Sequence, residues 1–107
     1  MFNMSKMLKQ VQKMQEDMAQ IQEQLSQERV EATSGGGVVK AVANGQGDLI
    51  SISIDPSVVD PQDISMLEDL IVAAAGEALC KARVLAAERM KAVTGGLQIP
   101  GLPGLGA

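Results

Sequence analysis

The sequence lacks the side chains on which most enzyme chemistry and most single-strand recognition depend. Its 107 residues include no histidine, no tryptophan, no tyrosine and a single phenylalanine, Phe2. Without histidine the chain has no ordinary general base, and without aromatic rings it has no platform on which unpaired bases can stack. The composition therefore predicts a protein that is not an enzyme and whose core is aliphatic and rich in methionine.

Cysteine and basic charge are also scarce. Cys80 is the only cysteine, so no internal disulfide can form, which suits a reducing compartment. Nine basic residues against thirteen acidic ones give a net charge of −4, whereas nucleic-acid-binding domains usually carry a basic excess. Any contact with nucleic acid must therefore depend on where the basic residues lie and not on their number.

Long apolar runs are missing as well. The apolar runs are far shorter than the stretch of about 20 residues that spans a bilayer, and lysines interrupt the apolar positions where a secretory signal would lie. We expect a soluble cytoplasmic protein with one domain, residues 1–94, followed by a flexible tail, residues 95–107. The tail is rich in glycine and proline, which disfavour regular structure, and we expect it to be dispensable for folding.

The middle of the chain is the only part with the alternating pattern of β-strands. Residues 50–54 place three isoleucines on one face and serines on the other. Upstream, residues 38, 40 and 42 (Val, Lys, Val) alternate with residues 39, 41 and 43 (Val, Ala, Ala). Asn44-Gly45 lies between these two segments and predicts a tight hairpin, because Asn-Gly tolerates positive φ angles. With an earlier candidate strand at residues 29–33, the pattern predicts a three-stranded antiparallel meander. Its apolar face should be covered by the two flanking helices.

The chain before the meander predicts a long helix from Asn3, its N-cap, to Gln27. Its apolar residues recur with spacings of three and four, the a/d pattern of a narrow helix–helix seam. The seam residues are Met4, Met7, Val11, Met14, Met18, Ile21 and Leu25. At 1.5 Å per residue the helix is about 37 Å long, which exceeds what a three-stranded sheet needs as cover. Part of it should therefore project.

Three lysines, Lys6, Lys9 and Lys13, crowd the first half of this helix. At about 100° per residue they fall within roughly 60° of one another, on the side away from the apolar seam. A helix N-terminus carries partial positive charge and favours acidic residues, so this placement opposes helix stability. A solvated face is the usual interpretation of such residues, but their position at the unfavourable end favours an anionic partner.

A second long helix follows the meander and is predicted to begin after Asp60 or nearer Asp63 and to end near Thr94. It is apolar on more than one side, since Val72 and Leu79 lie outside its main apolar stripe. A helix that is apolar on two sides is buried on two sides. One side should cover the sheet and the other a second subunit, which predicts an obligate homodimer.

No cofactor or metal site is visible in the sequence. The segment GGGVVK lacks the second glycine, followed by lysine and a hydroxyl residue, of a phosphate-binding loop. Asp55, Asp60 and Asp63 lack the alternating ligands and central glycine of a calcium loop, and Cys80, within the apolar second helix and without a histidine partner, is predicted to be structural. We therefore expect no cofactor, no metal and no small-molecule substrate.

Four stretches, taken in order, resemble the YbaB/EbfC family of bacterial nucleoid-associated proteins. They are MSKMLKQVQKMQEDM, SGGGVVKAVANGQGDLISISIDPSVVD, MLEDLIVAAAGEALCKA and GGLQIPGLPG, and together they cover nearly the whole chain. One departure is visible, because Gly76-Glu77 stands where the family often has Asn-Asp. Glycine there should weaken the helix by roughly 1 kcal/mol relative to alanine.

The resemblance implies an α+β homodimer that is associated with the nucleoid and binds double-stranded DNA, with helical arms from both subunits reaching toward it. The DNA-binding candidates that it implies are the lysines of the first helix and the basic residues of the second. They are Lys6, Lys9, Lys13, Lys81, Arg83, Arg89 and Lys91. The first three are the stronger candidates, because Arg89 and Lys91 lie in the last turns of a helix, where cations complement the dipole.

A second hypothesis is a protein-interaction module whose apolar seam holds a client or partner chain, as in prefoldin-like holdases. Net acidity favours it, since a homodimer doubles the charge of −4 and repels DNA except where lysines cluster. Salt separates the two hypotheses. DNA binding weakens steeply as salt rises, whereas binding through apolar surface does not.

Overall fold

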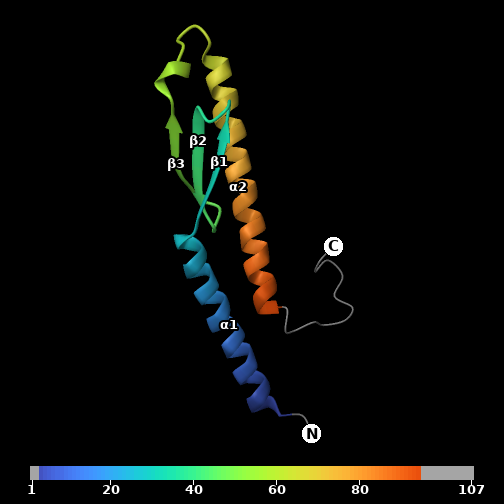
Figure 1. Cartoon of the computed structure of the whole chain (residues 1–107). Coiled ribbons are helices and arrows are strands. Elements are labelled where there is room, and N and C mark those ends of the chain that lie inside the picture. The colour runs from blue at the N-terminus through green and yellow to red at the C-terminus, as the bar shows by residue number, and fades with distance from the viewer. Residues whose placement is uncertain (1–2, 95–107) are drawn as a thin grey trace, which may run out of the picture.

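A computed structural model describes residues 3–94 and confirms the α+β fold class (Figure 1). Its elements in chain order are α1 (Met4–Gln27), β1 (Arg29–Ser34), β2 (Val39–Asn44), β3 (Leu49–Ile54), the 3₁₀ helix η1 (Pro56–Val58) and α2 (Ile64–Thr94). The molecule is elongated, with principal extents of 74 × 26 × 16 Å. The tail predicted at residues 95–107 lies outside the described residues, so its mobility stays a prediction.

The three strands form the predicted antiparallel meander in the order β1-β2-β3. A bulge interrupts the pairing of β2 with β3, because Val42 pairs with Ser51 whereas Ala43 pairs with Leu49, which leaves Ile50 without a partner. Ile52 and Ile54 pack against the core, but Ile50 is 47% exposed. The predicted common face of three isoleucines is therefore wrong at Ile50, since the extra residue of a bulge breaks the alternation of side chains.

The core lies between one face of the sheet and α2. Val39, Ala41 and Ala43 of β2 are fully buried, and so are three alanines of α2 spaced four residues apart, namely Ala74, Ala78 and Ala82. Residues with this spacing share one face of a helix, and their small side chains let its backbone approach the sheet closely. Partly buried leucines and isoleucines surround this alanine contact.

Helix α1 does not cover the sheet, so the prediction that both helices do so is wrong. Figure 1 shows α1 continuing away from the strands and running beside the C-terminal half of α2. Within α1 only Leu25, in the last turns, is buried. The cause is the connection to β1, which consists of Glu28 alone in an extended conformation. One extended residue cannot reverse the direction of the chain, so the helix projects beyond the sheet.

The hairpin between β2 and β3 is confirmed, but its mechanism differs from the prediction. Neither Asn44 nor Gly45 has a positive φ angle, and Gly47 alone supplies one in this turn, at 89°. Instead the Asn44 Oδ1 atom accepts hydrogen bonds from the backbone N–H groups of Gln46 and Asp48, at 3.0 and 2.9 Å. The asparagine therefore acts through its side chain, as in an Asx-turn.

Gly45 serves a close approach between the hairpin and α1. Its N–H group donates to the carbonyl oxygen of Leu25 at 2.8 Å. A β-carbon at this position would stand 2.7 Å from Leu25 Cδ2 and 2.9 Å from the Leu25 carbonyl oxygen. Only glycine therefore lets the end of α1 seat on the hairpin.

Side-chain caps define the helix starts. The Asn3 Oδ1 atom accepts from the N–H of Lys6 at 3.3 Å, which confirms the predicted N-cap of α1. Asp63 accepts from the N–H of Met66 at 3.3 Å, so α2 begins at the later of its two predicted starts, after Asp60 has accepted from Gln62 in the preceding turn. Neither helix within residues 3–94 combines the length and apolarity that a membrane span requires.

Candidate nucleic-acid interface

The lysines of α1 form an exposed cationic face. Lys6, Lys9 and Lys13 are all exposed, and none of their ammonium groups forms a salt bridge with another residue of the described chain. On a regular helix they lie about 150° from the middle of the apolar seam, and seven residues of rise spread them over about 10 Å. We name this face, made of Lys6, Lys9 and Lys13, the lysine stripe. Its charges are open to an external anion.

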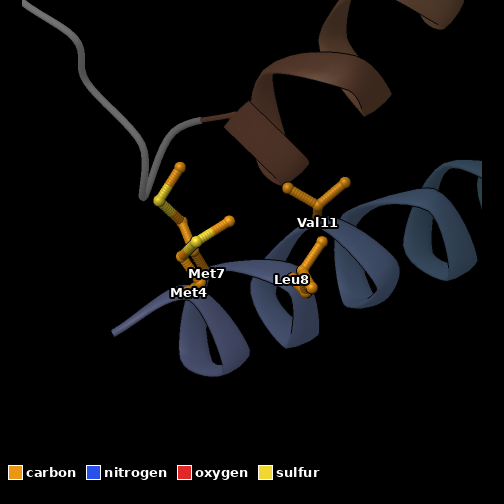
Figure 2. A pocket seen from close by; sticks show the side chains of 4 residues that line it. All are labelled: Met4, Met7, Leu8 and Val11. Carbon is orange, nitrogen blue, oxygen red and sulfur yellow. The ribbon is translucent and has the colours of Figure 1, made fainter. Parts of the chain in front are cut away.

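The apolar seam of α1 is uncovered at the same end of the helix. Met4 is 67% exposed and Met7 is 50% exposed, whereas Leu25 at the other end is 1% exposed. Figure 2 shows Met4, Met7, Leu8 and Val11 projecting from α1, where they line a hollow of about 140 Å³. The free end of α1 thus offers cations on one side and exposed apolar side chains on the other.

Negative charge dominates the half of α1 that is nearer the sheet. Glu16 and Glu23 are exposed there, and Asp17 is half-buried. A second, larger hollow of about 260 Å³ is lined by Glu23 together with Gln20, Gln24 and Gln27. It gathers no cation and no nucleophile, so we assign it no ligand. An anion is therefore attracted to the free half of the helix and repelled from the other half.

The basic residues of α2 differ in whether they form contacts with other residues of the described chain. Lys81 donates to the backbone oxygen of Glu31 at 2.9 Å and lies 3.9 Å from a carboxylate oxygen of Glu77. Arg89 forms a salt bridge with Glu28. Arg83 and Lys91 are exposed and form no salt bridge within residues 3–94. Two of the predicted DNA-binding residues therefore already have partners within the chain.

Sequence reasoning missed the residues that hold α1 in place. Glu28 was unremarkable in the sequence, yet it is the whole connection between α1 and β1 and the partner of Arg89. The Arg29 guanidinium donates to the backbone oxygens of Ser26 and Glu28, at 3.0 and 2.9 Å, and so satisfies carbonyl groups at the end of the helix. The only sign of this arrangement in the sequence was that no glycine separates the first helix from the first strand.

The described residues contain no cluster of three or more side chains that could hold a metal ion. Cys80 lies within α2 as predicted, but its side chain is exposed, so the prediction that it packs as a structural residue is wrong. It lies outside the Ala74–Ala78–Ala82 face of α2 that packs on the sheet. The residues at the free end of α1 can bind an anion, because three lysines supply positive charge and hydrogen-bond donors.

Known proteins share both the sequence and the fold. The chain matches the model of the YbaB/EbfC DNA-binding family over residues 1–97. It is 55% identical over 100 residues to a nucleoid-associated protein of Pelotomaculum thermopropionicum, covering 94% of this chain and 95% of that protein. It is 54% identical over 101 residues to a nucleoid-associated protein of Thermoanaerobacter pseudethanolicus, covering 94% and 91%.

A solved structure supports the fold independently. The crystal structure of uncharacterized protein HP0035 from Helicobacter pylori superposes with a TM-score of 0.72 at 20% identity, covering 92% of this chain and 100% of that one. The helix–meander–helix architecture is therefore common to both chains. The family match over residues 1–97 and the relatives at 54–55% identity show that this chain belongs to the YbaB/EbfC DNA-binding family.

Proposed function

We propose that the protein binds double-stranded DNA as a homodimer, without catalysis, and that it organises the chromosome or regulates genes at the nucleoid. The observation that carries this proposal is the lysine stripe, which is exposed, forms no salt bridge with residues 3–94 and lies at the free end of a projecting helix. The family is described as DNA-binding, and the two relatives above are named as nucleoid-associated. Contacts of this kind neutralise phosphates and carry no direct base readout.

Duplex DNA is the form that suits these residues. The chain has no tryptophan or tyrosine and only one phenylalanine, so it lacks the stacking platforms that hold single strands. The N-terminal end of α1 adds backbone N–H groups, which favour a phosphate. The cationic charge of the stripe is local, whereas the whole chain is acidic, so binding should depend on α1 being held in the right place.

A homodimer is supported by apolar surface that one chain leaves open. Val72 on α2 is 71% exposed, and the seam of α1 is exposed at Met4, Met7 and Val11. The core of one chain is small, since Leu25 and Val39 are the only large and fully buried side chains among residues 3–94. Two chains would cover part of this surface and would present two lysine stripes.

The proposal is tested by measuring binding to a fluorescent random-sequence duplex over a series of salt concentrations. If both stripes engage, six phosphates are neutralised, and log K should fall against log salt with a slope of about −5. A single strand of the same sequence, as the matched control, should bind more weakly. Sedimentation at micromolar concentration should give twice the chain mass. Duplex binding that does not change with salt would overturn the phosphate proposal, and a folded monomer would overturn the dimer.

A second candidate function is the holding of a protein partner along the seam. The hollow lined by Met4, Met7, Leu8 and Val11 favours it, because methionines adapt to irregular apolar surfaces. A client held in this way should stay bound as salt rises. A client that stays bound at high salt and is not displaced by duplex DNA would favour this candidate over the first.

A further inference from the structure

The lysine stripe is carried by a helix that hydrogen bonds and a salt bridge hold near its C-terminal end. Glu28 alone joins α1 to β1. The hairpin holds α1 through the N–H of Gly45, which donates to the carbonyl oxygen of Leu25 at 2.8 Å, and through the Gln46 Nε2 atom, which donates to that of Gln22 at 2.9 Å. Ahead of Gln22, α1 runs beside the C-terminal half of α2 (Figure 1), where Met14, Asp17 and Ile21 are half-buried, whereas the three lysines are exposed.

Arg89 supplies the attachment to the other long helix. Its guanidinium forms a salt bridge with the Glu28 carboxylate, which joins residues 61 apart in the sequence. The two side chains are 39% and 35% exposed, so solvent and salt screen this pair less than a pair on the open surface. The hairpin contacts hold α1 to the sheet, whereas the Arg89–Glu28 pair fixes the C-terminal end of α1 relative to α2.

This attachment has leverage over the lysine stripe. Lys6 is 22 residues from Glu28, which corresponds to about 33 Å along a regular helix. A rotation of about 10° at Glu28 would therefore displace Lys6 by about 6 Å, a distance longer than any hydrogen bond. Small changes at the root of α1 thus decide whether the lysines reach phosphates.

We propose that Arg89 and Glu28 form a clasp that sets the angle of α1, so that Arg89 is a positioning residue for DNA binding and not a phosphate contact. The DNA part of this inference rests on the function proposed above, whereas the geometry of the arm does not. A guanidinium that is bonded to a carboxylate within the chain has its charge neutralised and its orientation fixed. Arg83 has no such partner in the described part of the chain and is exposed on the same helix, which makes it the matched control.

The geometry is tested in the full-length Cys80→Ser chain with spin labels at Gln12→Cys on α1 and Gln62→Cys before α2, diluted with unlabelled chains. Both positions are exposed. Arg89→Gln should broaden the distance distribution between the labels, and the charge swap Glu28→Arg with Arg89→Glu should narrow it again. Arg83→Gln should leave it unchanged. A distribution that stays as narrow in Arg89→Gln as in the parent chain would overturn the clasp.

The DNA readout separates positioning from contact. Arg89→Gln should weaken duplex binding several-fold while the slope of log K against log salt stays the same, and the charge swap should restore affinity although residue 89 is then acidic. If Arg89 instead contacted phosphate in both subunits, the slope would flatten by about 1.8 and the swap would weaken binding further, which would overturn the inference. A parent chain that binds no duplex would contradict the proposed function and leave the distance result standing.

Discussion

Both long helices carry apolar residues along their length, but the fold uses them differently. In α2 the residues Ala74, Ala78 and Ala82 are fully buried against the sheet, whereas α1 buries only Leu25 and leaves Met4 67% exposed. An apolar stripe therefore identifies the side of a helix that can be covered, but it does not identify the covering surface. For α1 that surface has to come from outside the sheet.

The connections explain the difference. Residues 55–63, which include η1, separate β3 from α2, and this segment is long enough to turn the chain back across the sheet. Asp55 starts the turn by accepting from the N–H of Ser57 at 3.0 Å, a hydrogen bond that lowers the pKa of its carboxyl group. Between α1 and β1 there is only Glu28, so α1 continues away from the sheet. The length of a connection decided which helix became core and which became arm.

The largest effect should follow from a charge placed where α2 meets the sheet. Ala78 is fully buried, and Ala78→Asp would place an unpaired carboxylate among apolar side chains. The effective penalty is several kcal/mol, a large part of the roughly 5–15 kcal/mol by which domains are stable. We expect loss of the cooperative thermal transition in circular dichroism. Ala73→Asp, on the exposed side of the same helix, is the control, and equal effects would contradict the assigned core.

Shortening side chains along α1 should show that its two ends contribute differently to stability. Leu25→Ala should lower the free energy of unfolding by about 2–5 kcal/mol, because it leaves a cavity against the hairpin. Met7→Ala should lower it less than Leu25→Ala does, since Met7 is 50% exposed within one chain. Denaturant titrations of both variants measure this directly. A similar loss at Met7 would mean that the assembled protein covers the free end of α1.

A smaller effect is expected at Gly45. In Gly45→Ala the new β-carbon would meet the side chain and carbonyl oxygen of Leu25, which should cost about 1–3 kcal/mol as α1 shifts on the hairpin. In the Leu25→Ala background part of this clash is gone, so the double variant should lose less than the sum of the two single variants. Additive losses in denaturant titrations would mean that Gly45 does not seat α1.

The smallest effect should have the opposite sign. A β-carbon at Gly76 would meet no atom within 4 Å, so α2 has room for alanine at this position. Gly76→Ala should raise the free energy of unfolding by about 1 kcal/mol, because glycine is a poor helix former. The melting temperature of the full-length chain measures it. A decrease would show that a partner surface approaches α2 at this residue.

The sequence predicted the elements better than their packing. Periodicity and capping residues gave both helices, the meander and the N-cap at Asn3, because these depend on neighbours in the chain. The bulge at Ile50 and the contact of Gly45 with Leu25 depend on residues distant in sequence, and no local pattern encodes them. For the same reason sequence reasoning could place Arg89 on a helix but could not find its salt bridge with Glu28.

For the candidate interface too, the sequence predicted local features but not contacts between distant residues. The lysine stripe follows from helical spacing alone, and the structure leaves its three residues exposed. Which cations of α2 are available could not be predicted, because Lys81 bonds to Glu31 in a strand 50 residues away. The composition argued against an interface with nucleic acid, since the whole chain is acidic.

The most direct test of the account compares salt slopes of duplex binding between two charge-removing variants. The first variant replaces Lys6, Lys9 and Lys13 with glutamine, and the second replaces Arg83 and Lys91. The account predicts that the first variant weakens binding on every sequence and flattens the slope of about −5 markedly, while the dimer stays intact in sedimentation. The second variant should change the slope less. An unchanged slope in the first variant, with a flattened slope in the second, would contradict the account and assign the DNA contact to α2.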